Sequence, residues 1–185
     1  VETVRLHADM KFNTDSGKAN YVFADWDAVK ERNAILAPTG DEVWVLNGRV
    51  NALWNNLPDN LRREISKERW PTNFLEVNPQ DAADWGLENG DQVAIESDSV
   101  LDFVGKKVTG RFEAAVYVSD IVPPGITFTY FMFPGNPANA VVSGDTSLQP
   151  LNLRNNFKLG KGTITKIGRS EYADVMSFVP RNLVP

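Results

Sequence analysis

The segment 74–97, FLEVNPQDAADWGLENGDQVAIES, places the tightest constraint on the fold of this chain. It opens with an apolar run typical of a buried strand, and Asn78 followed by Pro79 is a typical helix cap and first helical residue. Gly86 is expected to end that helix in the left-handed conformation. ENGD then turns the chain into a second strand from Gln92 to Ile95. A strand, one short helix, a tight turn and a strand fit a barrel better than a doubly wound sheet.

Further strands are predicted on both sides of this segment. The stretch 110–120 alternates between two faces, as a strand does; Phe112, Ala114, Val116 and Val118 occupy one face, and Glu113, Ala115 and Tyr117 the other. Strands are also expected at 43–46, 123–133 and 162–168. About six short strands with two short helices predict a mainly β fold that closes into a mixed β-barrel, which removes exposed strand edges.

The flanking regions predict a lead-in and a tail. Residues 3–8 are interpreted as a strand, and 12–23 as a hairpin, because Asp15, Ser16 and Gly17 separate two extended arms. The stretch 59–70 is predicted to be a short surface helix. The resulting division is a lead-in hairpin and linker over 1–40, a barrel over 41–170 and a C-terminal tail over 171–185. Because the chain begins at Val1, we expect it to be a piece of a longer protein.

Charge and composition exclude several functions. The net charge of −5 leaves no basic stripe for a nucleic-acid surface. No apolar run reaches the roughly 18 residues of a membrane span, so no membrane span is expected. The absence of cysteine excludes a disulfide framework, an iron–sulfur cluster and a cysteine nucleophile from these residues.

No catalytic or metal-binding set is predicted. His7 has no second ligand nearby in the sequence, and Ser143, Asp145 and Ser147 lack a base. The acidic residues of the 79–91 region are interpreted as a solvated surface; they are Asp81, Asp84, Glu88 and Asp91. The chain alone is therefore expected to be inactive.

Polar loops follow the predicted strands and indicate a binding function. The loop after 43–46 carries Asn47, Gly48, Arg49, Trp54, Asn55 and Asn56, and two later loops carry Asn136 and Asn139, then Arg154, Asn155, Asn156 and Lys158. Amides hydrogen-bond to the edges of heterocycles, and cations neutralise phosphates. The set favours a nucleotide-like anion, although asparagine-rich loops also serve simply to form turns.

The order of these motifs resembles a known domain. DMKFNTDSGKA, LNGRVN, ERWPTNFLEVNPQDA and WGLENGDQVAI, followed by VPPGITF and an asparagine loop leading to NFK, resemble the C-terminal domain of the dimethyl sulfoxide reductase family of molybdenum oxidoreductases. Within that family the first three motifs are most similar to arsenite oxidase large subunits. The run after Gly125 departs from arsenite oxidases, which leaves a related enzyme such as an iodate reductase open.

The resemblance implies a double-psi β-barrel that closes over two molybdopterin guanine dinucleotides bound to one molybdenum atom, or to tungsten in one clade. By position in the family pattern, the cofactor-binding residues are Asn47, Gly48, Arg49, Asn55, Asn56, Asn139 and Lys158. The complete enzyme would transfer an oxygen atom and two electrons at an inorganic oxyanion. Its expected partners are the remaining domains of a large subunit, one of them with an iron–sulfur cluster, and a small electron-transfer subunit. An arsenite-oxidase-like protein would be periplasmic.

Two alternatives from other classes stay open at this point. Double-psi barrels also serve as substrate-recognition modules on ATP-driven unfoldases. They also form free-standing decarboxylases, but those cleave a Gly-Ser bond, and the chain has no Gly-Ser dipeptide.

Overall fold

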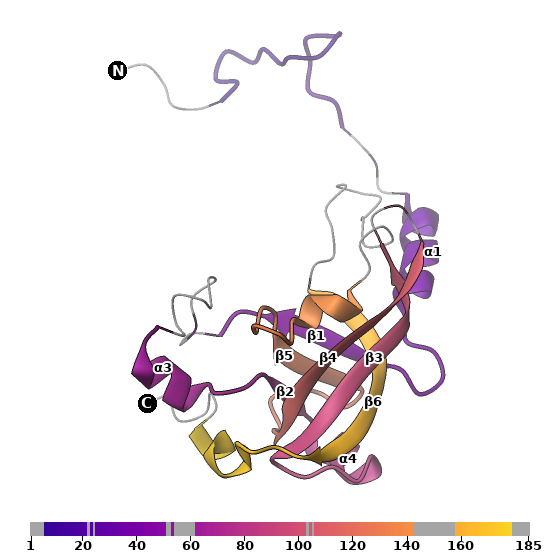
Figure 1. The fold of residues 1–185 in the computed structure, drawn as a ribbon. Helices are drawn as coiled ribbons and strands as arrows, with labels where there is room; N and C mark the ends of the chain where they lie inside the picture. The colour runs from indigo at the N-terminus through magenta and orange to yellow at the C-terminus, as the bar shows by residue number, and fades with distance from the viewer. Residues whose placement is uncertain are drawn as a thin grey trace.

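Six strands close into one barrel in the computed structural model, which describes residues 6–21, 23, 25–50, 53, 62–102, 104, 106–142 and 158–178. The strands are β1 (Val43–Gly48), β2 (Phe74–Val77), β3 (Asp91–Leu101), β4 (Lys107–Val118), β5 (Ile126–Tyr130) and β6 (Leu159–Arg169). Around the barrel they run in the order β1-β5-β2-β4-β3-β6, and β6 returns to β1 (Figure 1).

The strand pairing has an internal repeat. β1 is parallel to β5 and antiparallel to β6, while β2 is parallel to β4 and antiparallel to β5. Each of these two short strands therefore lies between one parallel and one antiparallel neighbour. The predicted fold class, a mainly β double-psi barrel with short helices, is confirmed.

Two hydrophobic clusters lie on opposite faces of β4. Phe112, Ala114 and Val116 point into the barrel core, whereas Ala115 and Tyr117 belong to an outer cluster. The predicted alternation along 110–120 is thus confirmed. The other buried members of the barrel core are Val45, Leu75, Val77, Ala82, Leu87, Val93, Ile95, Ala138 and Val141, and those of the outer cluster are Leu53, Trp70, Phe74 and Tyr130.

The helix α4 (Pro79–Asp84) forms as its sequence predicts. The side-chain oxygen of Asn78 accepts a hydrogen bond from the backbone N–H of Gln80, and Pro79 occupies the first helical position. Gly86 follows the helix with φ +64°, a conformation that glycine adopts without the steric penalty of a Cβ atom.

The lead-in differs from the prediction. No strand occurs in the described part of 6–23, so the hairpin over 12–23 is wrong, and the strand predicted over 3–8 falls partly outside the described residues. The apolar side chains of Leu6, Met10, Tyr21 and Phe23 are exposed. A two-stranded hairpin with no third strand or core to cover it is only marginally stable, which explains why turn-forming residues alone do not produce one.

Three short elements were not predicted, and one predicted helix is shorter. α1 (Trp26–Leu36) precedes the barrel, the 3-10 turn η1 (Ala138–Val141) lies at one end of it, and the 3-10 turn η2 (Ala173–Phe178) follows β6. α3 (Glu64–Arg69) forms only the second half of the helix predicted over 59–70, whose residues 59–61 lie outside the described part.

Within the described residues, no helix is both long and apolar enough to cross a bilayer.

Candidate functional site

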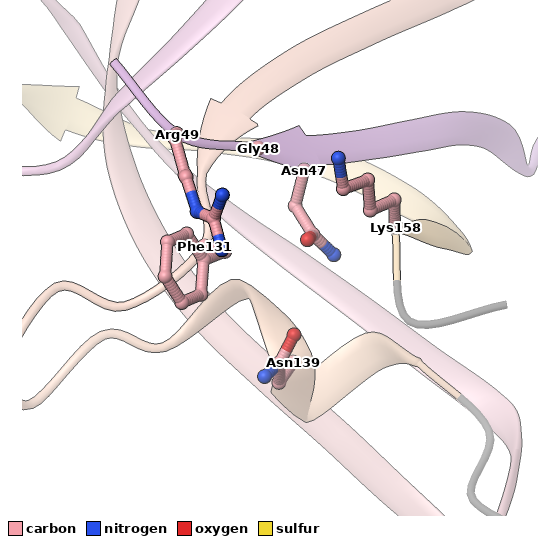
Figure 2. A pocket seen from close by; sticks show the side chains of 6 residues that line it. All are labelled: Asn47, Gly48, Arg49, Phe131, Asn139 and Lys158. Atoms are coloured by element: carbon pink, nitrogen blue, oxygen red, sulfur yellow. The ribbon is translucent and has the colours of Figure 1, made fainter. Parts of the chain in front are cut away.

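A cavity of about 290 Å³ opens at one end of the barrel, where β1 and β5 end and β6 begins (Figure 2). Its lining residues are Asn47, Gly48, Arg49, Phe131, Asn139 and Lys158. They come from three stretches far apart in the sequence and from η1. Five of these six side chains or backbone positions belong to the predicted set, and Phe131 is the addition.

Strand pairing explains how these stretches meet. In the parallel register Gly48 lies opposite Tyr130, so the chain leaves β1 and β5 at the same end of the barrel. The N–H of Phe131 donates to the Gly48 carbonyl at 3.2 Å, and the N–H of Asn47 donates to the Lys158 carbonyl at 3.0 Å. These backbone bonds fix the distance between the lining residues on β1 and those that follow β5 or precede β6.

The turn η1 brings Asn139 to the cavity. It lies directly on the barrel because β4 and β6 carry glycine at the points of contact. A Cβ atom on Gly110 would overlap the carbonyl oxygen of Ala140, and one on Gly160 would lie 2.7 Å from the carbonyl oxygen of Val141. Asn139 therefore lies at the cavity because η1 packs directly against the backbone of Gly110 and Gly160. A larger residue at either position would push η1 away.

Asn47 is the most informative lining residue. It is 4% exposed, and its Nδ2 has no hydrogen-bond partner among the described residues. A buried amide donor without a partner costs about 1–3 kcal/mol. Figure 2 shows this side chain directed into the cavity between Asn139 and Lys158. A ligand with an acceptor atom at this point would satisfy the donor.

The cavity is electropositive. Arg49 and Lys158 line it, and no carboxylate appears among its described lining residues. Neither cation forms an ion pair with a described residue, in contrast to Lys161, whose Nζ lies 3.1 Å from Glu42. A guanidinium and an ammonium without carboxylate partners, next to two amides, form a set suited to phosphate or to ring carbonyl oxygens.

The remaining predicted site residues are not tested. Asn55 and Asn56, like Trp54 and the 154–156 loop, lie outside the described residues. Phe131 was missed because its place depends on the parallel pairing of β1 with β5, which no local sequence pattern indicates. The strand predicted over 123–133 includes Phe131, whereas β5 ends at Tyr130, so the predicted strand gave no indication that Phe131 follows β5 at the cavity.

Two acidic residues of the 79–91 region have structural roles rather than the solvated ones predicted. Asp81 is buried, and its Oδ2 accepts a 2.7 Å hydrogen bond from the N–H of Gly125. Asp91 is buried too and binds Lys166 at 2.7 Å. Among the described residues, no cluster of three or more acidic or histidine side chains is arranged to hold a metal ion.

Comparisons with known proteins agree on one family. The family model described as "Molydopterin dinucleotide binding domain" matches residues 43–159. The chain is 36% identical to the iodate reductase subunit IdrA of Pseudomonas sp. (strain SCT), over 98% of the chain and 23% of that protein. It is 33% identical to IdrA of Denitromonas iodatirespirans, over 94% of the chain and 22% of that protein. It is 28% identical to the arsenite oxidase subunit AioA of Herminiimonas arsenicoxydans, over 92% of the chain and 19% of that protein. The chain thus spans less than a quarter of these relatives.

Proposed function

Because the chain belongs to the family of molybdopterin dinucleotide-binding domains, we propose that the cavity at the end of β1 and β5 binds part of a molybdopterin guanine dinucleotide that carries molybdenum. One observation carries the proposal: the unpartnered donor of buried Asn47 shares a cavity with two cations that have no carboxylate partner among the described residues. This set matches an anionic ligand with acceptor atoms on its rings.

The size of the cavity limits what it holds. Pockets for drug-sized ligands occupy about 300–1,000 Å³, and this one, at about 290 Å³, lies at the lower end. It therefore accommodates one portion of the dinucleotide. Asn55 and Asn56 are proposed to contact another portion.

Each lining residue has a distinct proposed role. Arg49 and Lys158 neutralise pyrophosphate or pterin oxygens, and the planar guanidinium can bind two oxygens at once. Asn47 Nδ2 donates a hydrogen bond to an acceptor atom of the cofactor, and the Asn139 amide forms hydrogen bonds with a second polar edge of the cofactor. Phe131 supplies an apolar wall that excludes water from these contacts, which strengthens them.

The activity of the complete protein is a wider proposal. The relatives are named as iodate reductase and arsenite oxidase subunits, so we infer that the full-length protein acts on an inorganic oxyanion. When bound, the cofactor supplies oxygen-atom and two-electron transfer at its metal. The proposal includes further domains of a large subunit, an iron–sulfur cluster in one of them, a small electron-transfer subunit and a periplasmic location. A family description that names a dinucleotide ligand lends no support to the alternative of a recognition module on an unfoldase.

Cofactor retention by variants of the full-length protein tests the site. Arg49→Ala and Lys158→Ala should each lower the molybdenum and pterin content of the purified protein, because a charge-assisted hydrogen bond contributes about 1.5–3 kcal/mol. Arg49→Lys should restore only part of the loss, since an ammonium cannot form the planar fork.

A matched control tests whether the loss of any positive charge, inside or outside the cavity, lowers the cofactor content. Lys30 lies on α1, where it pairs with Asp27 in a solvent-exposed ion pair. Lys30→Ala should leave the cofactor content unchanged. Full occupancy in both Arg49→Ala and Lys158→Ala would remove these two residues from the site.

A further inference from the structure

A buried asparagine outside the cavity holds the chain that forms one of its walls. Asn73 directly precedes β2 and is fully buried. Its Nδ2 donates to the Tyr130 carbonyl at 3.3 Å and to the Asn136 carbonyl at 3.1 Å. Its Oδ1 accepts from the N–H of Phe74 at 3.0 Å and from the hydroxyl of Thr129 at 3.3 Å. Both amide hydrogens and the carbonyl oxygen are therefore used.

The two carbonyls that Asn73 binds bracket a cavity residue. Tyr130 is the last residue of β5 and Phe131 follows it, while Asn136 lies shortly before η1 with its Asn139. Asn136 is itself anchored to the barrel, because its Oδ1 accepts a 3.1 Å hydrogen bond from the N–H of Glu113 on β4. The segment 130–136 is thus attached to the barrel at both ends.

This attachment bears on the cavity and not only on the fold. Neither Asn73 nor Asn136 is among the cavity's described lining residues, yet Phe131 lies between the two carbonyls that Asn73 binds. Asn139 lies three residues beyond the second. Groups that touch a ligand need neighbours that fix their position, since a displacement of about 1 Å is enough to weaken recognition severely.

We propose that Asn73 is a positioning residue for cofactor binding, which acts through the carbonyls of Tyr130 and Asn136 to hold Phe131 and Asn139 at the cavity. This inference rests on the function proposed above. The inference adds to the site a residue that does not line the cavity. The two hydrogen bonds that Asn73 donates fix the positions of Phe131 and Asn139.

An isosteric variant of the full-length protein isolates those donors. Asn73→Asp keeps the two accepted hydrogen bonds and replaces the donating nitrogen with an oxygen that donates to neither carbonyl when the carboxyl is ionised and to only one when it is protonated. The expected result is a loss of retained molybdenum and pterin of roughly tenfold or more, the lower end of what the loss of supporting contacts does at metal sites. Content is measured after dialysis at a temperature where circular dichroism shows every variant to be folded.

Thr127→Val is the matched control. Thr127 is fully buried on β5, the strand that ends at Tyr130, and its hydroxyl donates to the Trp44 carbonyl at 3.0 Å, away from Asn73. Removing this hydroxyl should lower the melting temperature while leaving cofactor content unchanged. If both variants instead lose cofactor in proportion to their melting temperatures, Asn73 is merely structural and the inference is overturned.

A second pair of variants covers the case in which Asn73→Asp does not fold. Asn136→Ala removes the acceptor for the Glu113 N–H, and Asn136→Asp keeps it. Loss of cofactor from the first and retention by the second supports the inference, because it shows that the site needs the 130–136 segment to be attached to the barrel. Unchanged content in Asn136→Ala would show that this attachment does not matter to the site, and so overturns the inference.

Arg49→Ala separates this inference from the function on which it rests. If Arg49→Ala loses cofactor while Asn73→Asp and Asn136→Ala retain it, the positioning role fails and the proposed site stands. If Arg49→Ala and Lys158→Ala also retain it, the proposed site fails as well, and the inference falls with it.

Discussion

At the scale of single residues, Asp91 links folding to pH. Burial alone would raise the pKa of this carboxyl, but the hydrogen bonds from Lys166 and from the Glu88 N–H, together with the charge of Arg169, outweigh it and lower the pKa below its ordinary 3.8. A lowered pKa means that folding favours the carboxylate. Its stabilising effect is therefore complete above pH 3.8 and is lost as the pH falls through the lower folded-state value.

Asp91→Asn should show this dependence. At pH 7 the variant should lose about 1–2 kcal/mol of unfolding free energy, because asparagine cannot form the ion pair with Lys166. The difference from the parent protein should shrink as the pH is lowered below 3.8. Urea denaturation at a series of pH values measures it, and a difference that stays constant across the series would contradict the assignment.

Some residues of the site could be predicted from the sequence, and others could not. Asn47, Gly48 and Arg49 were predicted because they follow an apolar strand in a motif with a known position in the family, and they line the cavity together with Asn139 and Lys158. Phe131 and Asn73 could not be predicted in the same way. Their roles come from contacts between segments whose pairing is visible only in three dimensions.

At the scale of elements, the position of the turn η1 depends on Gly110, the residue of β4 that has no side chain where η1 packs against it. Gly110→Ala should push η1 away from β4, because the new Cβ would overlap the Ala140 carbonyl. We expect a loss of about 1–3 kcal/mol in unfolding free energy. We also expect lower cofactor retention by the full-length protein, since Asn139 moves with the turn.

Thr109→Ala is the control for this element. Thr109 neighbours Gly110, and its hydroxyl makes only an exposed hydrogen bond to Asp98. Denaturation and cofactor content of this variant should both stay close to those of the parent protein. An unchanged cofactor content in Gly110→Ala would show that η1 does not position Asn139 for binding.

Local signals decided which elements were predictable. β4 was recognised from strict alternation, and α4 from Asn78, Pro79 and Gly86, all of which act within a few residues. α1 has an N-cap, since Asp25 accepts hydrogen bonds from the N–H groups of Asp27 and Ala28, but its sequence WDAVKERNAIL has no clear apolar stripe. η1 fits against the barrel because glycines on the distant strands β4 and β6 leave room for it. Its own residues therefore do not predict where it packs.

At the scale of the whole molecule, the barrel should fold without cofactor. Every strand has two neighbours and the interior is filled by apolar side chains, so no part of the closed sheet is stable while another part is open. The 185-residue chain should therefore melt in one cooperative transition by circular dichroism and calorimetry. A broad, non-cooperative transition would mean that the barrel needs its cofactor or its neighbouring domains.

The pairing of β1 also dictates when the site comes into existence. β1 is the first strand of the barrel along the chain, yet its partners are β5 and β6, the last two. Contacts between residues so distant in sequence form slowly, and during synthesis they must wait for the ribosome to release the end of the domain. Asn47 and Lys158 meet through the same pairing. A nascent chain that ends before β6 therefore contains most of the residues of the site but has no site.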